Sequence, residues 1–174
     1  DDPMVQQKIL NRDLLATSNE IATDAETLAS HIALAKAIKD YELRRVITFH
    51  SRIKNAKTFA EQHLNILDWM PQSDRPVGEI FAKYVSGSMT TAERNKKINL
   101  LKNIDKNQKG ILSNARCLSE GVDVPTLDGI AFIDPKRSQV DIIQAVGRAI
   151  RKSVDKSIGT IVIPVYLSEE DNAE

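Results

Sequence analysis

The residues best suited to chemistry lie late in the chain, in the run Gln144–Arg151 (QAVGRAIR). If this run is helical, Gln144, Arg148 and Arg151 share one face, because residues three and four positions apart stack on the same side. Gly147 beside that face leaves room for a close approach. Arginine stays charged and pairs bidentately with phosphate oxygens. The spacing indicates a site for a phosphorylated ligand, although a solvated helix face would show the same pattern.

A second polar run, Cys117–Pro125 (CLSEGVDVP), precedes the first. In it Gly121 gives the backbone freedom, Asp123 supplies a carboxylate and Pro125 fixes the exit. Alone, this run would read as a tight loop with a capping aspartate. A hydrophobic strand candidate and then Asp134–Pro135 separate it from the arginine run.

Together and in this order, the two runs resemble motifs V and VI of the superfamily 2 helicases and translocases. The resemblance covers the second, C-terminal RecA-like domain, from about Arg44 to Leu167. It is closer to the restriction-enzyme and DEAH-like branch than to the DEAD-box RNA helicases. Glu120 stands where DEAD-box proteins have Arg, Ala115 where they have Thr, and Gln144 where they have His.

This resemblance implies roles in ATP hydrolysis for the arginine run. Arg148 and Arg151 would be arginine fingers that stabilise charge on the γ-phosphoryl group in the transition state. Gln144 would hold a donor position in the same cleft and is grouped with them as catalytic. Gly121 and Asp123, with the two arginines, would contact the nucleotide.

The resemblance also implies a track for a nucleic-acid strand. Phe49 and Ser51 match motif IV, and Ser86–Gly87 resembles motif IVa, which contacts the sugar-phosphate backbone without reading bases. Phe49 could equally be a core aromatic residue. Ser51 is expected to cap the next helix, whose N-terminus suits a phosphate. The implied nucleic-acid contacts are Ser51, Arg52, Ser86, Gly87, Ser113, Asn114, Ser119 and Glu120.

Short apolar runs alternate with helical patterns, which predicts an α/β fold with an open, mostly parallel sheet and helices on both faces. Strands are predicted over residues 44–50, 84–85, 110–114, 127–133 and 160–166, and helices over 23–40, 53–67, 90–104 and from 138 through the arginine run. Capping-box patterns at Thr23–Glu26 and Thr90–Glu93 mark two of the helix starts. Residues 77–81 fit neither class.

Residues 1–40 are expected to be an N-terminal helical segment or a linker from a preceding domain, with His31 in a structural role. Residues 41–174 are expected to form the helicase C-terminal domain. The chain begins at Asp1 inside a polar stretch, which suggests a piece of a longer protein.

The composition is that of a soluble globular domain, with 41% apolar and 28% charged residues. Lys+Arg and Asp+Glu are 24 each, so any nucleic-acid contact must come from a local patch. The single cysteine, Cys117, excludes an internal disulfide, and we expect no metal ligands. No apolar run is long enough to cross a membrane, and a cytoplasmic location is expected.

The chain contains no G-x-x-x-x-G-K-S/T loop and no D-E-x-D/H run, the parts that hold phosphates and magnesium. By resemblance these belong to an N-terminal RecA-like domain of the same polypeptide, which would bind most of the ATP and Mg²⁺. We expect this chain to supply half of the ATP cleft and half of a nucleic-acid track, for DNA rather than RNA, and to be inactive alone. The alternatives are a non-catalytic helicase-fold docking module and the motor subunit of a restriction enzyme.

Overall fold

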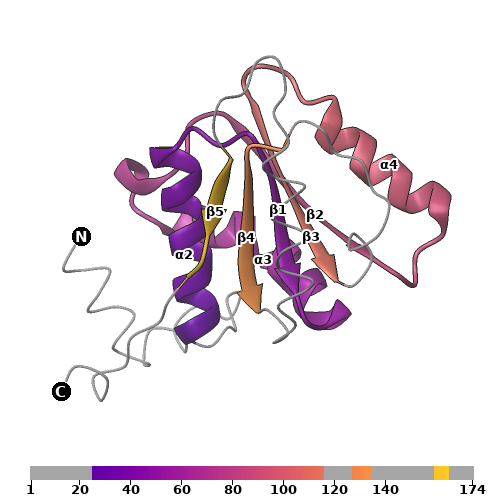
Figure 1. Ribbon diagram of the computed structural model, residues 1–174. Coiled ribbons are helices and arrows are strands. Elements are labelled where there is room, and N and C mark those ends of the chain that lie inside the picture. The colour runs from indigo at the N-terminus through magenta and orange to yellow at the C-terminus, as the bar shows by residue number, and fades with distance from the viewer. Residues whose placement is uncertain (1–24, 116–126, 135–158, 165–174) are drawn as a thin grey trace.

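The computed structural model describes residues 25–115, 127–134 and 159–164 (Figure 1). The helices are α2 (Ala25–Asp40), α3 (Ile53–Trp69), α4 (Thr91–Lys102) and the 3₁₀ helix η2 (Gln72–Asp74). The strands are β1 (Arg45–His50), β2 (Glu79–Ser86), β3 (Gln108–Ala115), β4 (Gly129–Asp134) and β5 (Thr160–Val162).

The strands lie side by side in one five-stranded sheet of order β2-β3-β1-β4-β5, as Figure 1 shows. Every pair is parallel, and β1 lies at the centre, with β3 on one side and β4 on the other. Parallel strands need crossover connections, and α3 lies between β1 and β2 in the chain while α4 lies between β2 and β3. The predicted α/β class with a parallel sheet is confirmed.

The two faces of the sheet carry separate apolar cores. Successive side chains of a strand point to opposite faces. Val46 of β1 therefore packs with Leu34 of α2 and Phe59 of α3, whereas Ile47 packs with Ile98 of α4 and Leu112 of β3. The prediction of helices on both faces is confirmed, and it explains why the central strands β1 and β3 are almost continuously buried.

Helix α2 packs as part of the same body. Leu28, Ile32 and Ala35 form a buried cluster with Ile66 and Leu67 of α3. The three α2 residues lie four and three positions apart, which is the spacing of one face of an amphipathic helix.

Two histidines join α2 to α3 inside the core. His31 Nδ1 lies 2.8 Å from His63 Nδ1, and the His31 ring stacks on Phe59 with 3.8 Å between centroids. One imidazole must donate from Nδ1 and the other must accept at Nδ1, so at least the accepting ring is neutral. Burial lowers the pKa of His63 to about 4. The pKa of His31 is held well below its usual value, mainly by burial and secondly by the nearby His63.

Asp128 connects β1 to β4 at the end of the sheet where these two strands begin. Its Oδ2 accepts hydrogen bonds from the backbone N–H groups of Arg44 at 3.2 Å and Arg45 at 2.8 Å. The Arg45 guanidinium donates to the carbonyls of Leu101 and Lys102, both at 3.2 Å. These bonds satisfy carbonyl groups in the last turn of α4, which have no partner within the helix.

The predicted capping box of α4 is confirmed, whereas the predicted bounds of β2 and β5 are wrong. The capping box of α4 is present, since Glu93 N–H donates to Thr90 Oγ1 at 3.2 Å and Thr90 N–H to Glu93 Oε2 at 3.0 Å. Strand β2 covers Glu79–Ser86, however, and not only Tyr84 and Val85. As an edge strand it carries exposed polar residues that hide its apolar pattern. Strand β5 ends at Val162.

The buried histidines predict a loss of stability in mild acid. His31, His63 and His50, whose pKa burial also lowers to about 4, have depressed pKa values in the fold. Between about pH 6.5 and 4 the unfolded chain therefore binds more protons than the folded chain, and stability falls as the pH drops. Each histidine adds a slope of up to about 1.4 kcal/mol per pH unit.

We expect a lower free energy of unfolding in urea at about pH 5 than at pH 7. The His63→Phe variant keeps the ring stack but loses one titrating group, so its pH difference should be smaller. Equal stability of the unaltered chain at both pH values would contradict the lowered pKa values of the buried histidines.

Candidate nucleic-acid interface

The parallel register brings the carboxyl ends of four strands to one edge of the sheet. Ala115 of β3 is paired with both His50 of β1 and Ser86 of β2, and His50 is also paired with Asp134 of β4. The loops that follow these strands start side by side. In open α/β sheets this edge is where ligands bind.

Three polar side chains meet where β1 and β4 end. Ser51 Oγ donates to Asp134 Oδ2 at 2.7 Å, and Asn55 Nδ2 donates to the same oxygen at 2.5 Å. Asp134 was given no functional role from the sequence and was named only as part of the segment between the two motifs. Its place at the end of a predicted strand, on the edge that also receives Ser51, was the signal that could have identified it. The carboxylate fixes the Ser51 hydroxyl and the first turn of α3.

The prediction that Ser51 caps α3 is wrong. The N-cap residue is Arg52, in an extended conformation with φ −129° and ψ 146°, and no side-chain cap is formed. The first bond of the helix runs from Ala56 N–H to the Arg52 carbonyl at 3.1 Å. The amides before Ala56 have no carbonyl partner within the helix, and they lie at its positive end beside the exposed Arg52. This arrangement suits a phosphate group.

The loop after β2 separates two residues that were predicted together. Ser86 is 1% exposed, with its hydroxyl 2.9 Å from the Ser88 hydroxyl, and its carbonyl accepts from Met89 N–H at 3.2 Å. Gly87 is exposed, and a Cβ at its position would meet nothing within 4 Å. Only Gly87 leaves space for an approaching strand.

Ser113 and Asn114 lie inside β3, as predicted, but both side chains are buried, which corrects the expectation that they contact nucleic acid. Ser113 is fully buried, and Thr48 Oγ1 donates to its hydroxyl at 3.0 Å while lying 2.9 Å from His50 Nε2. Asn114 is 2% exposed. Since β3 continues to Ala115 between two covered faces, neither side chain reaches the surface of the edge. Ser113 therefore belongs to a buried polar network, and not to the groove.

Phe49 lies on the α4 side of the sheet. Its ring stacks on Phe132 of the neighbouring strand, with 5.4 Å between centroids. It is partly buried against the core that contains Ile98 and Leu101. The aromatic pair therefore contributes to packing of β1 against β4.

The remaining predicted site residues lie outside the described residues. They are Ser119, Glu120, Gly121, Asp123, Gln144, Arg148 and Arg151. Within the described ranges, no helix is long and apolar enough to cross a membrane. No cluster of His, Cys, Asp and Glu suitable for a metal ion occurs in that same part of the chain.

Residues 29–153 match the family model of the helicase conserved C-terminal domain. The match covers most of the chain, so the chain belongs to the helicase C-terminal domain family. The resemblance stated from motifs V and VI is confirmed.

Among solved structures, the ATP-dependent Type ISP restriction-modification enzyme LlaBIII bound to DNA superposes with a TM-score of 0.77 and 28% identity. The superposition covers 94% of this chain and 11% of that chain. Domain 2 of the DEAD-box helicase Mss116p, bound to an RNA duplex, has a TM-score of 0.58 and 19% identity, over 80% of this chain and 49% of that chain. At that identity it shows the fold alone.

Curated relatives also carry helicase names. A probable helicase of African swine fever virus is 41% identical over 61 residues, which is 35% of this chain and 7% of that protein. The ATP-dependent DNA helicase uvsW of Enterobacteria phage T4 is 32% identical over 80 residues, or 45% of this chain and 15% of that protein. The chain thus spans a small part of the length of each relative.

Arg52 provides a test of the interface. Removing one cation that contacts a phosphate should weaken binding of a single-stranded DNA oligonucleotide to this chain without changing its sequence preference. We expect Arg52→Ala to lower the salt dependence, as the slope of log K against log salt, by about 0.7. Fluorescence anisotropy at several salt concentrations measures this slope.

The matched control is Lys106→Ala, which removes an exposed cation from the turn before β3, at the other end of the sheet. The control should bind like the unaltered chain. Equal effects of the two substitutions would contradict an interface at the carboxyl ends of the strands.

Proposed function

We propose that this chain is the second motor domain of an ATP-dependent DNA helicase or translocase. The observation that carries the proposal is the start of α3, which has no side-chain cap and lies beside exposed Arg52 at the carboxyl edge of the sheet. It combines a phosphate-binding helix end with an adjacent cation. The likeness to an ATP-dependent restriction-modification enzyme bound to DNA supports this proposal.

The nucleic-acid strand would cross the edge formed by the ends of β1, β2 and β3. Arg52 and the first amides of α3 would hold one phosphate, and the open backbone at Gly87 would lie against the next part of the strand. Ser51, whose hydrogen is donated to Asp134, would act chiefly by positioning this turn. Ser119 and Glu120 would complete the track. Such contacts do not read bases, as a moving motor requires.

The second half of the site would serve ATP. Gly121, Asp123, Gln144, Arg148 and Arg151 would face a nucleotide held mainly by an N-terminal RecA-like domain. Two guanidinium groups at helical spacing fit a triphosphate chemically, since each offers a fork of donors to phosphate oxygens. ATP with Mg²⁺ would supply the phosphoryl group whose transfer to water drives the motor. Arg148 and Arg151 would stabilise the charge that develops on that group.

DNA is favoured over RNA because the similar structure at 28% identity is described as bound to DNA and one relative is named a DNA helicase. A restriction-enzyme motor is a second candidate, favoured by the same superposition. A non-catalytic docking module is less consistent with a chain that has kept Gly147, Arg148 and Arg151 together with Asp123.

Replacing Arg148 or Arg151 with Ala in the full-length protein tests the proposal. Loss of an arginine finger should lower ATP turnover by about 10³-fold or more, while affinity for single-stranded DNA should remain measurable. Lys152→Ala is the matched control, because Lys152 is expected on the solvated face of the same helix. Turnover unchanged by both arginine substitutions would overturn the proposed roles.

A further inference from the structure

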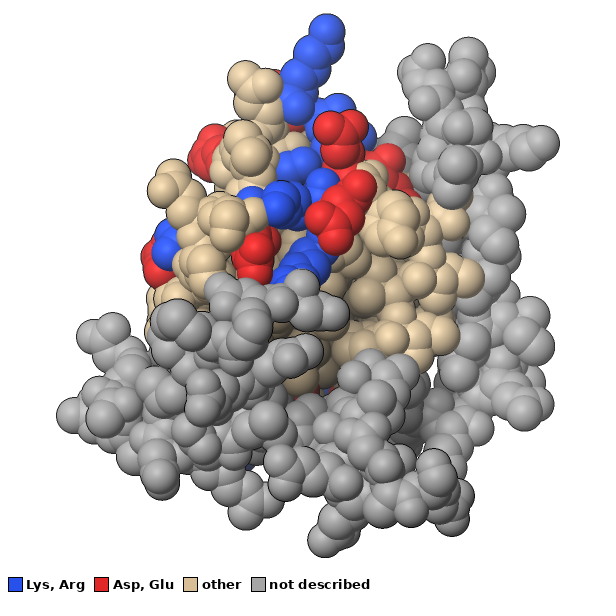
Figure 2. Space-filling model, turned by 90° about the vertical axis from the view of Figure 1, so that its left-hand side faces the viewer, with Lys and Arg blue, Asp and Glu red and all other residues tan. Residues whose placement is uncertain are grey.

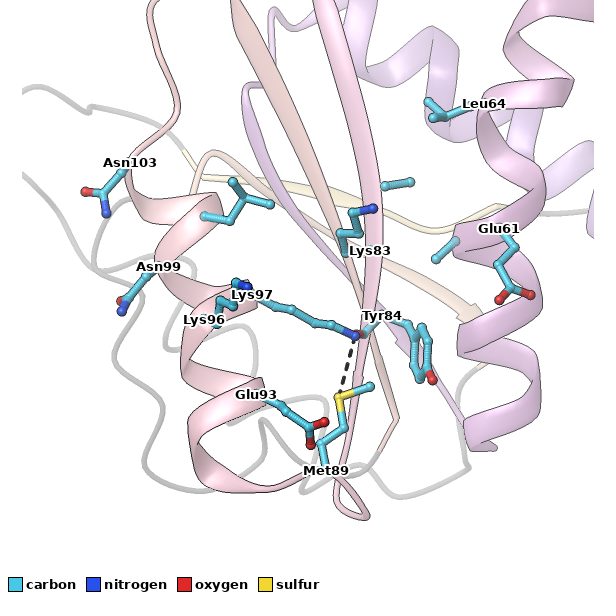
Figure 3. Close-up of a pocket in the computed structure, with 13 residues that line it drawn as sticks. Glu61, Leu64, Lys83, Tyr84, Met89, Glu93, Lys96, Lys97, Asn99 and Asn103 are labelled. Carbon is cyan, nitrogen blue, oxygen red and sulfur yellow. Dashed lines mark hydrogen bonds between the residues drawn. The ribbon is translucent and has the colours of Figure 1, made fainter.

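Strand β2 has one free edge. Among the described strands it pairs with β3 alone. Along its other side runs a groove of about 1020 Å³ between α3 and α4 (Figure 3). The side chain of Lys97 crosses this groove, and its Nζ donates to the Tyr84 carbonyl at 2.9 Å.

That contact shows which backbone groups face the groove. In a strand, alternate residues direct their N–H and C=O groups to the same side. Since the Tyr84 carbonyl points outward, the backbone groups of Ala82 and Ile80 point outward as well. Glu79, of opposite parity, instead donates its N–H to the Asn107 carbonyl just before β3, at 3.2 Å. The outward groups form a ready template for another strand.

The α4 side of the groove is cationic. Lys83, Lys96 and Lys97 line it, and none forms an ion pair with another described residue. Lys83 projects on the same side of β2 as Val85, which packs in the core beneath α4. The Lys97 ammonium also lies 4.4 Å from the centre of the Tyr84 ring. Glu93, the acidic residue on this wall, is already bonded to Thr90 in the capping box.

The α3 side is mainly apolar. Ala60 and Leu64 of α3 and Ala82 of β2 line it, and Figure 3 shows the Tyr84 ring on this side. Leu64 is 38% exposed, whereas Phe59, Ile66 and Leu67 of the same helix are buried. Glu61 is the charged residue on this wall. A strand placed in the groove would thus face lysines on one side and an apolar wall on the other.

We propose that the free edge of β2 binds an extended peptide segment of a protein partner in which acidic residues alternate with apolar residues. A backbone N–H of the segment would replace the Lys97 ammonium at the Tyr84 carbonyl. The released ammonium would pair with a carboxylate on the same segment. The apolar residues would cover Leu64 and the Tyr84 ring. This is recognition by strand addition, in which backbone bonds give affinity and alternate side chains give specificity.

Charge and hydrogen bonding favour this occupant over two others. A second copy paired through β2 would bring Lys83 and Lys97 of both copies together, which like-charge repulsion opposes. A nucleic-acid backbone offers phosphate charge but no row of alternating N–H and C=O groups to match the strand. The groove also lies along the side of the sheet, apart from the edge assigned to nucleic acid, so this inference does not rest on the proposed function.

The test uses this chain, labelled with ¹⁵N, and a synthetic peptide of about eight residues in which Val alternates with Glu. We expect the peptide to shift the amide resonances of residues 80–84 selectively. A peptide in which Lys replaces Glu should not bind. N-methylation of alternate peptide amides should abolish binding in one register and spare it in the other, because only one edge of a strand pairs with β2.

Two variants complete the test. Lys83→Gln combined with Lys96→Gln should lower the affinity for the peptide about tenfold, whereas Lys106→Gln should leave this affinity unchanged. The proposal is overturned by no binding up to about 1 mM, by equal binding of the Lys peptide, or by shifts at another face. Competition by a single-stranded DNA oligonucleotide for residues 80–84, or a dimer formed through them, would also overturn it.

Discussion

Strand β1 pairs in parallel on both sides, and most of the structure depends on that double pairing. It puts β3 and β4 in register with β1, so that the ends of these strands and of β2 reach the same edge. Asp128 holds the other end by accepting from two backbone N–H groups of the segment that starts β1. With one end of the sheet held by this partly buried carboxylate, the strand ends at the other end keep fixed relative positions, which is what a phosphate-binding edge requires.

The polar residues near this edge divide into those that hold the sheet and those that face outward. Thr48, Ser113 and His50 bond to one another within the core, and buried polar groups of this kind are costly unless they are paired. Because these side chains bond to one another inside the core, they are not placed to bind a ligand at the surface. Arg52 and Gly87 lie outside the network and remain exposed. Among the described residues of the predicted track, Arg52 and Gly87 therefore face solvent, whereas Ser113 does not.

Predictions from sequence succeeded where the controlling interactions are local. The capping box of Thr90 and Glu93 spans three residues, and the α/β alternation is set by periodicity within each element. The cap assigned to Ser51 failed because its hydroxyl bonds Asp134, 83 positions away. Ser113 was expected in the groove because the sequence does not show whether the end of a strand is buried. In the structure β3 continues to Ala115, and Ser113 is buried. The family itself was predictable from two short motifs, since their chemistry fixes residue types and order.

We propose that this domain belongs to a motor driven by ATP on DNA. The most direct measurement is the ATPase rate of the full-length protein with no polymer, with single- and double-stranded DNA, and with the corresponding RNAs. For a DNA motor we expect a rate that rises on addition of DNA and rises less with RNA. A rate that no polymer changes, or no turnover at all, would contradict it and would favour a helicase fold retained for docking.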